Sequence, residues 1–109
     1  MSLRNKVTLI GRTGKDVEIV KFENGKIAKV SLATTDHYTN GLGEKVEETQ
    51  WHNLTANGKI ADIMEKYVDK GKEIAVEGKI VYRNYEDKEG IKRYSTDIRV
   101  DQLVLLSGK

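Results

Sequence analysis

Trp51 is the residue whose type and placement first suggest a binding chemistry, because it is the only Trp of the chain and lies in a polar segment, 48–59. In a β-strand, alternate side chains point to opposite faces. His52, Leu54 and Ala56 then share the core face, and Trp51 falls on the polar face. The alternation predicts an exposed indole. The alternative is a ring buried by a bulge or an interface, since Trp is usually well buried.

Tyr85 follows the same pattern in a second apolar stretch. Its side chains alternate between an apolar face and a polar, basic face. The apolar face carries Ile74, Val76, Ile80 and Tyr82, and the other carries Glu77, Lys79, Arg83 and Tyr85. Exposed rings beside cations are what binding of single-stranded nucleic acid requires, because bases stack on the rings and Lys and Arg neutralise phosphates. The alternative for Tyr85 is a ring that covers its own hairpin.

Residues that could support catalysis or metal binding lack the required spacing. The stretch Gly11-Arg12-Thr13-Gly14-Lys15 departs from the Gly-x-x-x-x-Gly-Lys-[Ser/Thr] phosphate loop. His37 and His52 have no ligand-spaced His or Cys partner, and the chain has no Cys. No Ser-His-Asp order or paired-carboxylate motif is recognisable. We therefore expect no enzyme activity, no metal and no cofactor.

The elements that must position these rings are mostly strands, because short β-branched stretches alternate with Gly-containing turns and Pro is absent. Strands are expected at 7–10, 18–22, 26–35, through Trp51, at 72–85 and at 92–106, with a turn at 11–14, a hairpin at 23–25, a loop at 39–45 and a charged tip at 86–90. The apolar stripe from Ile60 to Val68 predicts one helix, with Gly71 in the residue position that follows its C-cap.

Such a set of elements in 109 residues favours a small closed barrel, because a lone helix can plug one end of it. The predicted fold class is all-β with one helix, a five-stranded OB-fold barrel, in a single domain spanning residues 1–109. The formal net charge is only +2, so binding of a polyanion must come from the local arrangement of cations. Neither a membrane span nor a secretory signal is recognisable, and we expect a cytoplasmic protein.

Short motifs are spread along nearly the whole chain: Asn5-Lys6-Val7, Leu9-Ile10-Gly11, Gly14-Lys15-Asp16, Leu32-Ala33-Thr34, Glu48-Thr49-Gln50-Trp51-His52, Gly58-Lys59-Ile60-Ala61, Lys70-Gly71, Val76-Glu77-Gly78 and Arg93-Tyr94-Ser95-Thr96. In this order and spacing they resemble those of the bacterial single-stranded DNA-binding proteins. The resemblance implies an OB-fold that binds and protects single-stranded DNA, with little sequence preference, in replication, recombination and repair. It also implies a homotetramer associated with the nucleoid.

The same resemblance implies stacking rings at Tyr38, Trp51 and Tyr85. It places Asn57 where the family has a Phe, which suggests a helix N-cap in place of a fourth stacking ring. The candidate phosphate partners are Lys59 and Arg83, which match basic positions of the family, together with Arg12, Lys15, Lys79 and Arg93. His52 and Asn5 are expected at a subunit interface rather than at a site of chemistry.

Family members commonly continue into a tail with an acidic tip that recruits replication and repair proteins. This chain ends at Leu106-Ser107-Gly108-Lys109, so we expect a short form without recruitment through such a tail. Two other functions stay open at this point. One is an OB-fold protein-interaction or replisome accessory module, whose binding would vary little with salt; the other is an RNA-binding OB protein, which competition between RNA and DNA would reveal.

Overall fold

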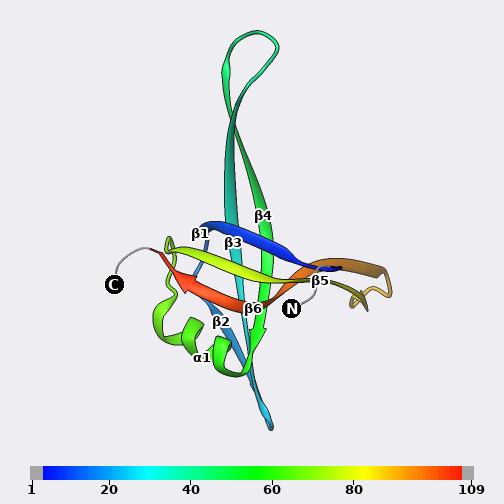
Figure 1. Cartoon of the computed structure of the whole chain (residues 1–109). Coiled ribbons are helices and arrows are strands. Elements are labelled where there is room, and N and C mark those ends of the chain that lie inside the picture. The colour runs from blue at the N-terminus through cyan, green and yellow to red at the C-terminus, as the bar shows by residue number, and fades with distance from the viewer. Residues whose placement is uncertain (1–3, 107–109) are drawn as a thin grey trace.

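The computed structural model describes residues 4–106 and shows a closed five-stranded β-barrel with one helix, which confirms the predicted OB-fold (Figure 1). The elements are β1 (Val7–Thr13), β2 (Glu18–Phe22), β3 (Gly25–Thr39), β4 (Lys45–Asn57), α1 (Gly58–Tyr67), β5 (Glu73–Glu86) and β6 (Lys92–Leu105). The strand order is β1-β5-β6-β4-β3-β2. Pairing of β1 with β3 closes the five strands β1, β5, β6, β4 and β3 into the barrel, and the short strand β2 pairs with β3 beyond β1. Residues 107–109, where the expected end without a tail falls, lie outside the described residues.

β1 continues past the predicted turn and passes through Gly11. A Cβ at Gly11 would lie 2.9 Å from the carbonyl carbon of Ala33 in β3. The turn prediction was therefore wrong for this glycine, which instead allows two strands to approach closely where the barrel closes. The chain then turns, and β2 pairs with an earlier part of β3, so β1 and β2 run in succession along the same partner strand.

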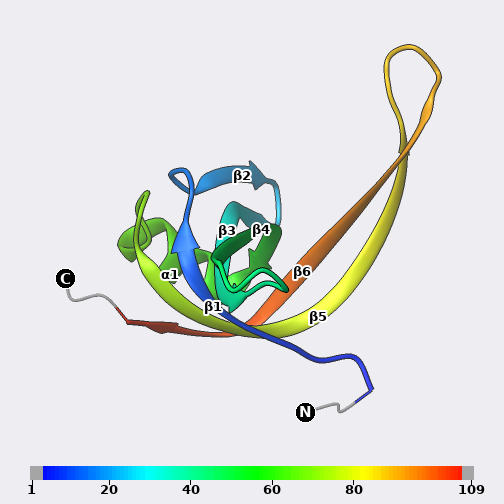
Figure 2. The ribbon, with the colours of Figure 1, turned by 90° about the horizontal axis from the view of Figure 1, so that it is seen from above.

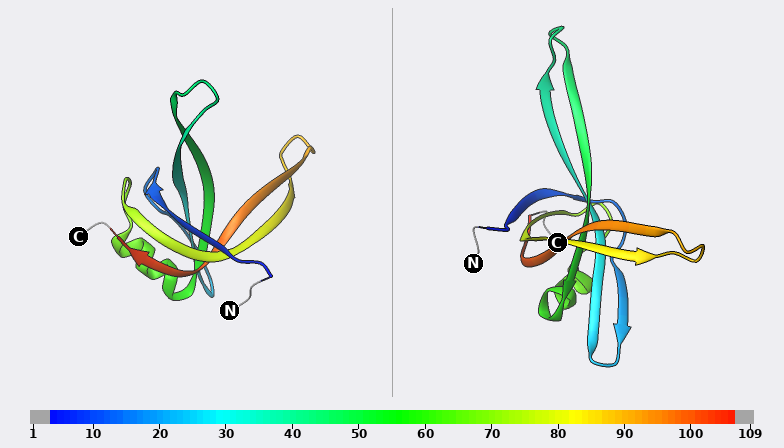
Figure 3. Two further views of the ribbon diagram at one scale, coloured as in Figure 1. Left: turned by 45° about the horizontal axis from the view of Figure 1, so that its top comes forward. Right: turned by 90° about the vertical axis from the view of Figure 1, so that its right-hand side faces the viewer.

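Two hairpins extend beyond the barrel as arms that diverge from each other (Figures 2 and 3). The β3–β4 arm ends in a loop where the side-chain oxygen of Asn40 accepts hydrogen bonds from the N–H groups of Leu42 and Glu44. The β5–β6 arm ends in a similar turn built on Asp87. Such Asx turns close the hairpins locally. Tyr82 lies on the same face of β5 as the apolar core residues, but it is 74% exposed because the β5–β6 arm extends beyond the core.

The helix α1 ends at Tyr67, before the predicted position, and Gly71 lies in the turn that follows it with a φ of 82°. The N–H of Gly71 donates to the carbonyl oxygen of Thr13 at 2.9 Å, so this glycine connects the turn to β1. At the other end of α1, Asn57 occupies the expected N-cap position, but its side chain makes no capping hydrogen bond.

An ion pair cluster joins the helix to the β2–β3 hairpin, which forms where the sequence predicts it, although Gly25 is not in the turn but begins β3 and pairs with Phe22. The ammonium of Lys26 lies 2.7 Å from the Asp62 carboxylate and 2.6 Å from that of Glu65. The hydrogen bonds to Asp62 and Glu65 raise the pKa of Lys26, and the hydrogen bond from Lys26 lowers the pKa of each carboxyl. The cluster holds the hairpin against the helix.

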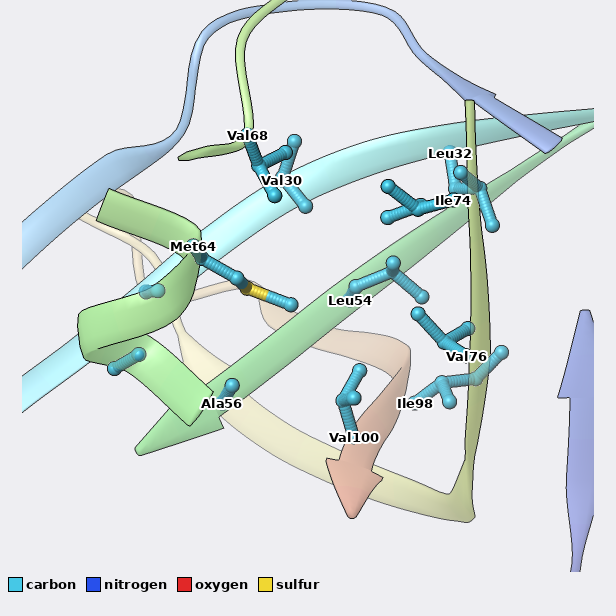
Figure 4. Packing of buried hydrophobic residues seen from close by; sticks show 12 residues of the cluster. Val30, Leu32, Leu54, Ala56, Met64, Val68, Ile74, Val76, Ile98 and Val100 are labelled. Atoms are coloured by element: carbon cyan, nitrogen blue, oxygen red, sulfur yellow. The ribbon is translucent and has the colours of Figure 1, made fainter. Parts of the chain in front are cut away.

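The core fills the barrel from alternate positions of the strands and from one face of α1 (Figure 4). Leu54 and Ala56 are buried, as the alternation around Trp51 predicts. Met64 points from the helix toward Leu54, so α1 closes one end of the barrel (Figure 4). Truncating a buried side chain such as Leu54 to Ala would cost about 2–5 kcal/mol. The inward side chains thus fix which side chains of β3 and β4 face outward.

Candidate nucleic-acid interface

The floor of the candidate site is the outward face of β3 and β4, continued onto β6 and β5. Residues that pair directly across neighbouring strands share a face. One such row crosses four strands and consists of Lys29, Thr55, Arg99 and Lys79. The neighbouring row consists of Ser31, Asn53, Asp97 and Val81. The barrel thus brings three cations from distant parts of the sequence into one line on the face that also carries Trp51.

Trp51 is 62% exposed, which confirms the prediction from strand parity. It pairs with Ala33 on the outward face of β3. Its six-membered ring lies against Gly14: a Cβ at that residue would come 2.8 Å from Cη2 and still closer to Cζ3. The absence of a side chain at Gly14 therefore makes room for the indole. Exposed indole of this kind offers a flat surface on which a base can stack.

Two adjoining hollows lie along this face. The first, which we call the Tyr85 hollow, has a volume of about 370 Å³ and includes Lys15, Asn53, Tyr85 and Ser95 in its lining. The second, the Asn57 hollow, has a volume of about 150 Å³ and includes Val20, Ile27, Asn57 and Arg99. Lys29, Thr55, Arg83 and Asp97 line both hollows, so the two form one continuous groove.

Arg83 projects into this groove from β5, and Tyr85 lies two residues further along the same face. The Nε of Arg83 lies 2.7 Å from a carboxylate oxygen of Asp97, whose side chain is only 7% exposed, whereas that of Arg83 is 53% exposed. Tyr85 is 55% exposed, as parity predicts. Asp16 and Glu18 also line the Tyr85 hollow, so the cations of the groove are partly balanced by acids. Binding of a polyanion here depends on stacking as well as on charge.

The remaining predicted cations have different surroundings. Arg12 lies opposite Ala33 on the face of Trp51, and its Nη1 donates to the carbonyl oxygen of Gly71 at 3.2 Å. Arg93 lies opposite Tyr85, and its Nε donates to Asp87 at 2.9 Å. Lys59 is exposed on α1 and lines neither hollow. The groove therefore brings together Lys15, Arg83 and Tyr85, with Lys79 in the basic row, whereas Lys59 lies apart from them.

Tyr38 is half-exposed but pairs with Val46, five residues from the Ala33–Trp51 pair. Tyr38 lies five positions after Ala33, an odd offset, so its side chain leaves the β3–β4 ribbon on the opposite side from Trp51. The ribbon twists strongly as it leaves the barrel (Figure 1). The register thus places on opposite sides of the ribbon two rings that the family resemblance assigns to one stacking path. A nucleic-acid strand that contacts both Trp51 and Tyr38 has to follow the twist of the ribbon.

His52 and Asn5 both make hydrogen bonds within the chain. The Nε2 of His52 lies 2.9 Å from the Thr34 hydroxyl, on the side of β4 opposite Trp51. The side-chain amide of Asn5 exchanges two 3.0 Å hydrogen bonds with the backbone of Ile80, and so extends the pairing of β1 with β5. Among residues 4–106, no cluster of three or more His, Asp, Glu or Cys side chains is suited to holding a metal, and no helix has the length and apolarity to cross a membrane.

Sequence reasoning missed several residues of the groove. Lys29 could have been found, because Ala28, Val30 and Leu32 mark the core parity of β3 and leave Lys29 outward. Arg99 has the same signal in β6, where Ile98 and Val100 are buried. No signal in the sequence marked Asp97, because its role depends on Arg83, which lies on another strand.

Comparison with known proteins places this geometry in a family. The model of the single-strand binding protein family matches residues 4–106. The chain belongs to that family. It is 45% identical over 108 residues to a single-stranded DNA-binding protein of Bacteroides thetaiotaomicron and 41% identical over 110 residues to one of Neisseria meningitidis. These alignments cover 96% and 100% of this chain but 67% and 63% of the relatives, so the chain spans about two thirds of their length.

Solved structures of the family share the fold. A structure of the Plasmodium falciparum single-strand binding protein in complex with single-stranded DNA superposes with a TM-score of 0.89 at 28% identity, with 98% of each chain covered. A deletion mutant of the single-stranded DNA-binding protein from Thermus aquaticus gives a TM-score of 0.83 at 27% identity, covering 96% of this chain and 51% of the other. The family resemblance seen in the sequence motifs is thereby confirmed.

Proposed function

We propose that this chain binds single-stranded DNA with little sequence preference, by stacking bases on Trp51 and Tyr85 and placing phosphates against the cations of the groove. The observation that carries the proposal is the exposed Trp51 ring on the face that continues into the groove. Gly14 contacts this ring and the next residue, Lys15, lines the Tyr85 hollow, so a strand can pass from one ring to the other over a continuous surface. Stacking tolerates any base, because every base has a π-face.

Replacement of Trp51 by Ala tests the proposal directly. We expect the affinity for oligo-dT to fall by about 1–3 kcal/mol, the usual contribution of one stacked base. Tyr67→Ala is a matched control, because Tyr67 is also a half-exposed ring but lies on α1, away from both hollows. Equal affinities for the two variants would contradict the proposal.

Salt dependence distinguishes this function from binding of a protein partner. Lys15, Lys29, Arg83 and Arg99 line the hollows. If each neutralises one phosphate, the logarithm of the binding constant should fall with the logarithm of salt concentration with a slope of about −3 per chain. A slope near zero would favour the protein-interaction alternative, and stronger binding of RNA than of DNA of the same sequence would favour the RNA-binding alternative.

The family likeness supports several finer proposals. We infer that residues 1–109 act as one OB-fold domain, without enzyme activity, and that the chain works as a homotetramer in the cytoplasm at the nucleoid, in DNA replication, recombination and repair. His52 and Asn5 are proposed to lie near a subunit contact. Measurement of the molar mass in solution by light scattering tests the tetramer, because a mass near that of a single chain would contradict it.

A further inference from the structure

Asp97 is a buried carboxylate on the face proposed to bind a polyanion. It occupies the outward-facing row with Ser31 and Asn53, yet its side chain is only 7% exposed. A negative charge beside the path of phosphates should weaken binding if it acts only through its charge. Its position therefore points to another role.

That role follows from how Asp97 holds Arg83. The carboxylate forms an ion pair with the Nε of Arg83 at 2.7 Å, while the Arg83 side chain stays 53% exposed. Arg presents its donors in a rigid planar fork, so fixing Nε fixes the direction of the other donors. Arg83 lines both hollows together with Lys29, and the two cations thus border the place where the hollows meet.

A second observation points to a ligand at the same place. Ser95 lies directly opposite Arg83 and lines the Tyr85 hollow. Its Oγ is buried and has no hydrogen-bond partner within the described part of the chain. Buried hydroxyl groups normally have a partner. Rotation of Ser95 about χ1 would turn this hydroxyl toward a polar ligand that enters the hollow and reaches Arg83, and that ligand would supply the missing partner.

We propose that Arg83, Lys29 and Ser95 form a phosphodiester site between two successive nucleotides, and that Asp97 is the positioning residue that aims Arg83 into it. This inference rests on the proposed function, because the phosphodiester belongs to a bound single strand. It predicts that removing the negative charge of Asp97 weakens the binding of a polyanion, whereas a simple charge effect would make that binding tighter.

The test is a double-mutant cycle with Asp97→Asn and Arg83→Met in the full chain, with oligo-dT as the probe. Asn is close in shape to Asp but carries no charge, so this substitution removes the ion pair that holds Arg83. We expect Asp97→Asn to weaken binding about threefold to tenfold in the wild-type background, within the range of coupling between residues in contact. In the Arg83→Met background the same change should leave binding unchanged or slightly tighter, because only the repulsive charge is then removed.

A wild-type protein that binds oligo-dT while Asp97→Asn binds it as tightly or more tightly would overturn the positioning role. A wild-type protein that fails to bind oligo-dT would instead overturn the proposed function itself. Thermal unfolding verifies that the variants are folded. Should Asp97→Asn fail to fold, Arg83→Lys decides: it keeps the charge but loses Nε and the fork, so a loss similar to that of Arg83→Met supports the site, and wild-type affinity overturns it.

Discussion

Replacement of Gly14 by Ala moves the Trp51 ring without removing it, and so tests whether the position of the ring matters. The φ of Gly14 is not positive, so Ala fits the backbone there. The added Cβ would lie 2.8 Å from Cη2 of Trp51 and closer still to Cζ3, so the ring must retreat by about 1 Å to reach the 3.4 Å of an ordinary contact. Because the indole is exposed, it can move, and we expect a change in stability of only about 0.5 kcal/mol.

Binding should respond more than stability. A displaced ring loses part of its overlap with a base, so we expect the affinity for oligo-dT to fall by about 0.5–1 kcal/mol, less than the about 1–3 kcal/mol expected for complete loss of the ring. Titration of labelled oligo-dT measures the affinity, and the emission maximum of Trp51, the chain's only Trp, reports that the ring has moved.

Gly41→Ala is the matched control. Gly41 has open space where a Cβ would be, lies in the loop between β3 and β4, and has no positive φ. We expect wild-type affinity and wild-type emission for this variant. If Gly14→Ala shifts the emission of Trp51 but binds oligo-dT as tightly as Gly41→Ala, a base does not stack on this ring.

Two further predictions follow from the groove and from the ion pair cluster. Lys29→Ala should weaken binding to oligo-dT and make the salt slope shallower by about 0.7, because Lys29 lines both hollows, whereas Lys59→Ala on α1 should change both much less; the reverse order would contradict the placement of the groove. Lys26→Met should lower the melting temperature slightly near neutral pH, and high salt should reduce the difference, because the cluster is exposed. The contribution from the lowered pKa values of Asp62 and Glu65 is complete above their ordinary values of 3.8 and 4.5 and is lost as the pH falls through the lower folded values. The contribution from the raised pKa of Lys26 is complete below 10.5 and is lost as the pH rises through the higher folded value. Melting curves of both proteins from acid to alkaline pH check this window, and a difference that grows in acid would contradict it.

Local alternation was enough to predict the exposure of Trp51 and Tyr85, because buried neighbours such as Leu54 and Val76 fix the inward parity of each strand. The same reasoning did not reach Tyr38, whose side depends on how far β3 continues beyond the barrel and how it pairs with β4. Strand parity describes one strand, whereas the side from which a ring leaves a twisted ribbon also depends on the partner strand.

Glycines gave the least reliable sequence signals. Gly11 and Gly71 have the residue type of a turn and of a helix end, but one permits close approach of β1 to β3 and the other lies beyond the end of α1. Contacts between distant strands were equally hidden from the sequence. The pairing of Arg83 with Asp97 requires the β5–β6 register, which only the folded barrel supplies.

Stacking of a base on the exposed indole is tested most directly by titrating the wild-type protein with oligo-dT and following the emission of Trp51. Because this is the chain's only Trp, the signal comes from one known ring. We expect strong quenching that saturates with the same midpoint as an independent measurement of binding. Saturated binding with unchanged emission would show that the strand does not lie on Trp51.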